Sequence, residues 1–250
     1  MKNLRILAVL AAIVLAMSLG LKATVPPSCW DTPEVECGPG WQDAQPVTYV
    51  HPLYPGCTIT LYFEYQECHT NYNTVVSYNF RLTAIQYTSS DACNALTSAL
   101  EITFPNMIGN QVLLYQIWKE GLNQAADDWF SWQDPMDYRC GIRNLTFRTV
   151  VPGGCASWAW AYKSDPIAGT MVFRFIPVPC TGEGCCIIDR VLCWNVAEQK
   201  VDKQTYITMV DAENCSARTP QYDPFTTYGP EWYRGLPTPC GQFCFVWSVE

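Results

Sequence analysis

One row of regularly spaced aromatic side chains lies in the segment SWAWAY, residues 157–162. Side chains two residues apart share a face of a β-strand, so Trp158, Trp160 and Tyr162 would stand in line, about 6.8 Å apart. Such a flat row can stack on the apolar body of a sugar ring. The same row could instead fill the core, with two alanines on the opposite face. A core position is preferred, and a glycan-binding platform is the alternative.

A second group with chemical potential is acidic, namely Asp127, Asp128, Asp134 and Asp137. Carboxylate oxygens are ligands that Ca²⁺ prefers, although this spacing matches no EF-hand. A bound cation would also relieve the unfavourable position of carboxylates at the C-terminal end of a helix. A solvated helix end explains the same residues. Calcium is the one cofactor for which the sequence offers candidate ligands.

Catalytic groups are sparse, and no catalytic residue is assigned. His51 and His69 are the only histidines, and no GxSxG motif accompanies them. Paired carboxylates could hydrolyse glycosides, but Glu64 and Glu67 point to opposite faces of a predicted strand. The cysteines lack zinc-site spacing. The sequence therefore favours a protein without enzymatic activity.

The charge balance limits the classes of partner. Acidic residues outnumber basic ones by 23 to 15. Removal of residues 1–23 would leave 12 basic residues and a net charge of −11. This balance argues against nucleic acid and anionic membrane surfaces as partners.

The first 23 residues resemble an export signal. Lys2 and Arg5 precede an apolar run over 6–17, which is too short to span a bilayer, and a cleavage site follows at 21–23. No later run reaches a membrane-spanning length. We therefore expect a mature protein that is secreted or held at the cell surface, without a transmembrane segment.

All 14 cysteines follow this leader, and an even number in an exported chain predicts a disulfide framework. Cys57 and Cys68 bracket one predicted strand and are therefore too far apart to bond each other. Cys185 and Cys186 should point to opposite faces and take different partners. The framework comprises Cys29, Cys37, Cys57, Cys68, Cys93, Cys140, Cys155, Cys180, Cys185, Cys186, Cys193, Cys215, Cys240 and Cys244.

The longest helical pattern spans residues 106–130, with Asn106 or Asn110 as its N-cap. Its apolar residues recur every three or four positions, at Ile108, Val112, Tyr115, Trp118, Leu122, Ala126 and Trp129. Because an isolated helix is marginally stable in water, this stripe needs a surface to cover. We expect the helix to pack on a sheet.

Alternating apolar residues predict strands on both sides of this helix, at 57–67, 75–87, 142–151, 156–162, 170–178, 186–195, 205–210 and 243–249. A short helix is expected at 91–100. Three Phe-Arg pairs, Phe80-Arg81, Phe147-Arg148 and Phe173-Arg174, predict phenylalanine inward and arginine outward. The expected fold class is α+β, a disulfide-rich antiparallel β-sheet protein with one long amphipathic helix packed on the sheet.

Four parts are expected along the chain. They are a signal peptide (1–23, removed), an N-terminal arm with prolines and cysteines (24–45), a main α+β domain (46–179), and a cysteine-rich β lobe packed on that domain (180–250). The terminal strand either closes its own sheet or pairs with a neighbouring molecule.

These features favour a non-enzymatic cell-surface or extracellular-matrix protein with a structural or assembly role. Its partners would be other extracellular proteins or copies of itself. A glycan-binding module that uses the aromatic row is the first alternative. A secreted, carboxylate-dependent hydrolase of the glycosidase type is the second.

Overall fold

The computed structural model describes residue 29 and residues 35–70, 75–103, 107–210 and 215–244. Its strands are β1 (Val35–Cys37), β2 (Gln42–Asp43), β3 (Val47–Val50), β4 (Thr58–Thr70), β5 (Val75–Thr88), β6 (Ile102–Thr103), β7 (Met107–Ile108), β8 (Leu145–Pro152), β9 (Cys155–Asp165), β10 (Thr170–Pro179), β11 (Cys185–Asn195), β12 (Lys200–Val210), β13 (Tyr233–Arg234) and β14 (Gly241–Gln242). Its helices are α3 (Asn94–Ala99) and α4 (Gln111–Ser131), with 3-10 turns η1 (Asp91–Cys93), η2 (Pro135–Tyr138), η3 (Cys215–Ala217) and η4 (Pro224–Thr227).

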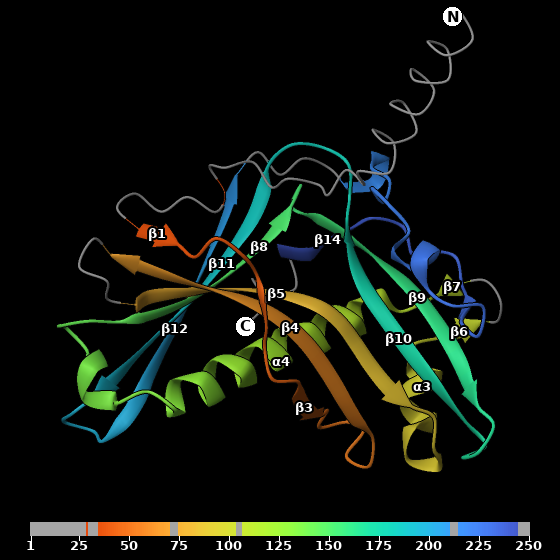
Figure 1. The fold of residues 1–250 in the computed structure, drawn as a ribbon, viewed down its shortest axis with the longest axis horizontal. Helices are drawn as coiled ribbons and strands as arrows, with labels where there is room; N and C mark the ends of the chain where they lie inside the picture. The colour runs from red at the N-terminus through yellow and green to blue at the C-terminus, as the bar shows by residue number, and fades with distance from the viewer. Residues whose placement is uncertain (1–28, 30–34, 71–74, 104–106, 211–214, 245–250) are drawn as a thin grey trace, which may run out of the picture.

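One 12-stranded sheet dominates the described residues, in the order β12-β11-β8-β5-β10-β9-β13, with β4 along the other edge of β5. Two strands share one edge of β5. Strand β8 pairs with it from Ser77 to Asn79, and β10 pairs with it from Ile85 to Thr88. The sheet therefore divides at β5 into two wings, with β8, β11 and β12 in one and β10 and β9 in the other (Figure 1).

The expected fold class is wrong. The protein is mainly β, and its sheet is mixed because β5 and β8 run parallel. The prediction that the helix buries a single apolar stripe is also wrong. Val112, which was assigned to the stripe, is 51% exposed, whereas Leu113, Leu114 and Ile117 are buried. Burial extends around much of α4, so the helix is not an amphipathic element laid on one face of an antiparallel sheet.

The N-terminal start of α4 follows local chemistry. The side chain of Asn110 accepts a hydrogen bond from the backbone N–H of Leu113 at 3.3 Å, which confirms this residue as the N-cap. Asn106 lies outside the described residues. Further along, Gly121 lies so close to β4 that an added Cβ would come within 2.3 Å of Leu61 Cδ2. A glycine at this position allows the close approach.

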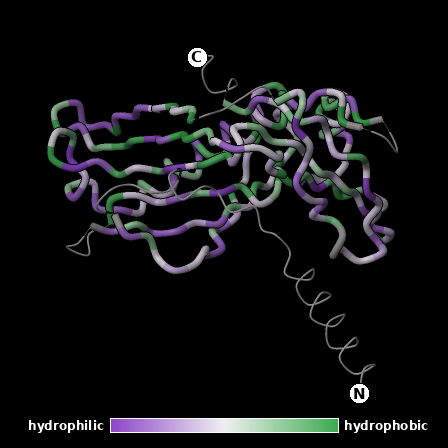
Figure 2. The backbone as a smooth tube through the Cα atoms, turned by 90° about the horizontal axis from the view of Figure 1, so that it is seen from above, coloured by the Kyte–Doolittle hydropathy of each residue, from purple (hydrophilic) through white to green (hydrophobic). Residues whose placement is uncertain are grey.

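Several local predictions are confirmed. Strands β4 and β5 form the expected antiparallel hairpin, and α3 with η1 occupies the expected short helix. Phe80, Phe147 and Phe173 are at most 1% exposed, while the arginine that follows each is partly exposed. Figure 2 shows hydrophilic and hydrophobic stretches alternating along the chain.

All fourteen cysteines lie among the described residues, and all are paired, as predicted. Cys185 and Cys186 take different partners, and Cys57 and Cys68 do not bond each other. The bonds are Cys29–Cys185, Cys37–Cys68, Cys57–Cys93, Cys140–Cys193, Cys155–Cys215, Cys180–Cys240 and Cys186–Cys244. This framework fits an extracellular, disulfide-stabilised protein.

Some expectations fall outside the described residues. These include the export signal at 1–23 and most of the terminal strand expected at 243–249. The division into a main domain and a C-terminal lobe at residue 180 stays a prediction. In the structure, β11, which follows residue 180, pairs with β8, which precedes it. No helix in the described part of the chain is long and apolar enough to cross a membrane.

Candidate functional site

The aromatic row of β9 lies in the core rather than at the surface. Trp158 and Trp160 are 0% exposed, and only Tyr162 is partly exposed. The Trp158 ring centroid lies 5.5 Å from that of Tyr115 and 6.0 Å from that of Trp118, both on α4. A sugar cannot reach the two buried indoles, so the row does not form the platform offered as an alternative.

The C-terminal segment covers the outer edge of this row. Trp160 Nε1 donates a hydrogen bond to the Leu236 carbonyl at 3.1 Å, and the Gly235 N–H donates to the Trp160 carbonyl at 3.1 Å. Thr238 bonds to the backbone of Trp158 in both directions. This segment therefore satisfies an edge of β9 that would otherwise be open to a ligand.

The four aspartates do not converge. Asp127 accepts from Lys203 Nζ at 2.6 Å and from Arg190 Nη2 at 3.3 Å. Asp134 caps η2 by accepting from the Met136 N–H at 2.9 Å. Asp128 and Asp137 are exposed. Among the described residues, no group of three or more His, Cys, Asp or Glu side chains could hold a metal. Basic side chains from β11 and β12 meet the charge at Asp127.

The histidines and the two glutamates have local partners. His51 is 8% exposed, and its Nδ1 accepts from the Leu53 N–H at 3.1 Å. Burial lowers the pKa of His51, an effect that Glu120 opposes. His69 lies 3.6 Å from Glu67. Glu64 pairs with Arg81. These contacts stabilise a turn and a hairpin, and they do not bring two carboxylates together.

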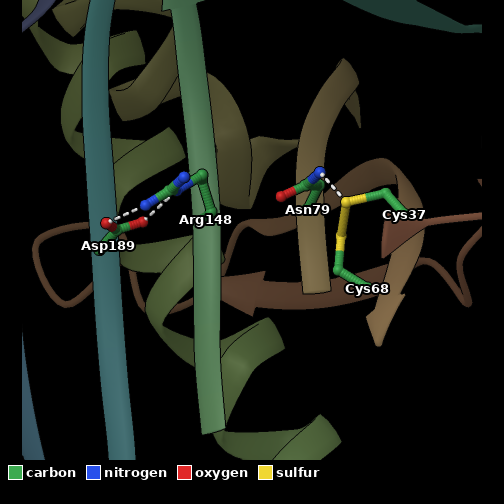
Figure 3. A network of polar contacts seen from close by, with 5 residues as sticks. All are labelled: Cys37, Cys68, Asn79, Arg148 and Asp189. Carbon is green, nitrogen blue, oxygen red and sulfur yellow. Dashed lines mark hydrogen bonds and ion pairs between the residues drawn. A yellow bond between two sulfur atoms is a disulfide. The ribbon is translucent and has the colours of Figure 1, made fainter. Parts of the chain in front are cut away.

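A polar row crosses the sheet opposite the α4 side (Figure 3). Arg148 binds both carboxylate oxygens of Asp189 at 2.7 Å, and hydrogen bonding to Asp189 raises the pKa of Arg148. Asn79, which pairs with Arg148 across β5 and β8, donates to Cys37 Sγ at 3.4 Å. The row lies at the division of the sheet, where Arg148 and Asp189 bind each other and Asn79 binds Cys37.

The edge of the sheet at β12 is open along the described residues. Strand β12 pairs with β11 along its whole length, and no described strand pairs with its other edge. Tyr206 is 54% exposed and Met209 is 57% exposed. The second half of the strand, residues 205–210 (TYITMV), contains no charged residue, proline or glycine. We call this segment the β12 edge.

A small groove lies beside the C-terminal end of α4. Its volume is about 270 Å³, and the loop before β3, strands β4 and β5, and α4 contribute to its wall. Trp129 and Trp132 line it with their ring centroids 5.3 Å apart, and Asp128 and Gln45 add polar groups. Trp132 is 62% exposed. We call this the Trp129–Trp132 groove.

Sequence reasoning missed the groove and did not recognise the β12 edge as open. The strand at 205–210 was predicted, but its place at the end of the sheet depends on the pairing order. The groove joins segments far apart in the chain, so no local pattern marks it. No family model matches the chain, and neither a curated protein nor a solved structure matches it.

Proposed function

We propose that the protein is a non-enzymatic structural component of the cell surface or extracellular matrix that assembles with copies of itself through the β12 edge. The observation that carries this proposal is a partly exposed, uncharged strand segment at an unpaired end of the described sheet. The disulfide framework supports an extracellular setting.

An open strand edge offers a row of backbone N–H and C=O groups to another strand. Threonine, tyrosine, isoleucine and valine favour extended structure, and short segments without charge or proline pair readily. Lysine is a common protection against such pairing. Here Lys200 and Lys203 occupy only the first half of β12, and Lys203 is bound to Asp127.

A second copy of the chain is the occupant that this edge fits. Two β12 edges related by a twofold axis would continue one sheet into the next and use the same surface on both molecules. The protein carries a net charge of −8, so close approach of two copies is opposed in general. An uncharged segment is where that opposition is smallest.

The experiment adds charge to the edge. In the variant Tyr206→Lys with Met209→Lys, repulsion between copies should prevent assembly while the melting temperature changes little, because both side chains are exposed. Leu53→Lys with Leu236→Lys is the matched control, since these exposed apolar residues lie elsewhere. Sedimentation velocity should show concentration-dependent oligomers for wild type and control, and monomers for the edge variant. A wild-type protein that is monomeric at every concentration would refute the proposal.

A further inference from the structure

The open edge of β12 differs in length from the other ends of the sheet. Strand β12 runs for 11 residues, and no described strand pairs with its outer side. The strands that cover β4 and β9 contain two to four residues each, namely β1, β2, β3, β13 and β14. A short end strand discourages pairing with another molecule, whereas a long one is a template for it. Within the described part of the chain, β12 is therefore the end strand that best fits a second copy.

The direction of the backbone groups along β12 follows from the neighbouring strand. The N–H of Cys140 donates to the carbonyl of Trp194 at 3.0 Å, so the backbone groups of Trp194 point away from β12. Trp194 lies opposite Val201, and β11 and β12 pair in one continuous register. Because backbone direction alternates along a strand, Val201 and every second residue after it direct N–H and C=O to the open edge. In the second half of β12 these residues are Thr205, Ile207 and Met209.

The residues available for pairing form an uncharged run. Positions 204–210, QTYITMV, carry no charge, and Lys203 and Asp211 bound the run in the sequence. Ile207 is the middle residue of this run, and its backbone groups are among those that point outward. In a twofold antiparallel pair centred on Ile207, every residue of the run would lie opposite another uncharged residue.

The two neighbouring registers are less favourable. Moving the twofold axis to Tyr206 would place Lys203 opposite Met209 of the second copy, and so bring a charge against an apolar side chain. Moving it to Thr208 would carry Gln204 past Val210 of the second copy, where β12 ends. Both shifts reduce the part of the uncharged run that is paired.

The register centred on Ile207 also gives favourable side-chain pairs. On the face of the sheet opposite α4, Tyr206 would lie beside Thr208 of the second copy, in the kind of pair where side chains approach most closely. An aromatic ring beside a β-branched residue is one of the stabilising cross-strand pairs. Both side chains are exposed in the single molecule, so pairing would remove them from water.

We propose that β12 pairs with β12 of a second copy in the antiparallel register centred on Ile207, and that the product is a closed dimer. This inference rests on the assembly proposed above and adds its register and its endpoint. Thr205, Ile207 and Met209 would form roughly six backbone hydrogen bonds with the same residues of the second copy. A twofold contact uses the same edge of both molecules and leaves that edge of neither free for a third.

Engineered cysteines on the exposed face of β12 distinguish the registers. In the proposed pair, the Cα atoms of Tyr206 and of Thr208 in the second copy lie about 4.5 Å apart, which a disulfide can bridge. A mixture of Tyr206→Cys and Thr208→Cys proteins should therefore cross-link on mild oxidation. Each variant alone should not, because its two cysteines are diagonal neighbours about 7–8 Å apart. The native cysteines are all paired, so the introduced thiol is the reactive one.

The control is a mixture of Gln204→Cys and Thr208→Cys proteins. Gln204 is exposed on the same face, but in the proposed register it is diagonal to Thr208 of the second copy and should not cross-link. Cross-linking of Tyr206→Cys alone would move the axis to Tyr206, and cross-linking of Thr208→Cys alone would move it to Thr208. Either result would overturn the proposed register.

A proline tests the backbone pairing directly. The N–H of Met209 points to the open edge, so Met209→Pro should preserve the hydrogen bonds between β11 and β12. It would remove one donor and place its ring where the second copy must approach. Sedimentation equilibrium should show monomers for Met209→Pro and dimers for the control, Met209→Ala. Undiminished dimers with Met209→Pro would overturn the proposal, as would wild-type assemblies larger than a dimer.

Failure of this inference is distinguishable from failure of the assembly proposal. If the wild-type protein forms dimers but the mixed cysteine variants do not cross-link, the register is overturned and assembly stands. If the wild-type protein is monomeric at every concentration, both are overturned.

Discussion

Gly121 sets the distance between α4 and β4. An alanine there would gain about 1 kcal/mol of helix propensity. Its Cβ would, however, meet the fully buried Leu61 at 2.3 Å, and overpacking of a core costs about 1–3 kcal/mol. We expect Gly121→Ala to lower the free energy of unfolding by about 1 kcal/mol in urea titrations. Gln116→Ala, on the exposed side of the same helix, is the control and should change little. A more stable Gly121→Ala would contradict the close contact.

Asp127 compensates a buried cation. Arg190, on β11, is 8% exposed and donates hydrogen bonds to Asn123 and Asp127 on α4. Removal of the carboxylate would leave this guanidinium without its counter-charge, at a cost of about 1–3 kcal/mol. We expect that loss for Asp127→Ala in chemical unfolding. The neighbouring exposed Asp128 provides the control, because Asp128→Ala should lower the free energy of unfolding by only a few tenths of the loss expected for Asp127→Ala. Equal losses would show that the Arg190 contact contributes nothing.

His51 predicts a pH dependence with a definite sign. Burial lowers its pKa below the ordinary 6.5, so the folded state binds this proton less tightly than the unfolded chain. Stability present above pH 6.5 should therefore be lost as the pH falls through the lowered pKa of the folded state. In His51→Asn, the amide oxygen can still accept from the Leu53 N–H but does not titrate. Urea unfolding between about pH 7 and pH 5 should show a shallower decline for the variant. Identical declines would exclude His51 as the source.

At the scale of elements, the segment before β14 protects the edge of β9. Thr238 is 1% exposed, and its Oγ1 accepts from the Trp158 N–H at 2.9 Å. Thr238→Val would keep the shape and leave that buried N–H without a partner, which costs about 1–3 kcal/mol. Calorimetry should show a lowered melting temperature. Thr48→Val, at an exposed position of β3, should be neutral. If both variants melt alike, the hydrogen bond does not stabilise the edge.

Local patterns predicted elements better than they predicted pairing. The alternation around Phe80, Phe147 and Phe173 correctly assigned both the strands and their buried faces, because a strand has a period of two wherever it lies. The parallel pairing of β5 with β8 joins residues far apart in the chain, and it changed the fold class. For α4, the spacing of three to four residues predicted a helix. How much of the helix surface is buried depends on the elements packed around it, which the sequence pattern of the helix does not show.

The candidate sites belong to the whole molecule, which is why the sequence located them poorly. Trp158 and Trp160 belong to the most regular aromatic row in the sequence, and both are buried in the core. Trp129 was predicted as part of an apolar stripe. Its role beside Trp132 depends on the loop before β3 closing one side of the groove. The disulfide partners of Cys185 and Cys186 could be predicted to differ, because adjacent residues on a strand point apart, but their identities require the fold.

The last prediction concerns the disulfide framework as a unit. Each of the seven disulfide bonds contributes about 2–5 kcal/mol to the free energy of unfolding. The total free energy of unfolding of a folded domain is only about 5–15 kcal/mol. Three bonds, Cys155–Cys215, Cys180–Cys240 and Cys186–Cys244, attach the C-terminal segment to the sheet. We expect full reduction with blocking of the thiols to abolish the near-ultraviolet circular dichroism of the aromatic core. A mock-treated, unreduced sample is the control. A reduced protein that keeps this signal and melts cooperatively would show that the core is sufficient without its bridges.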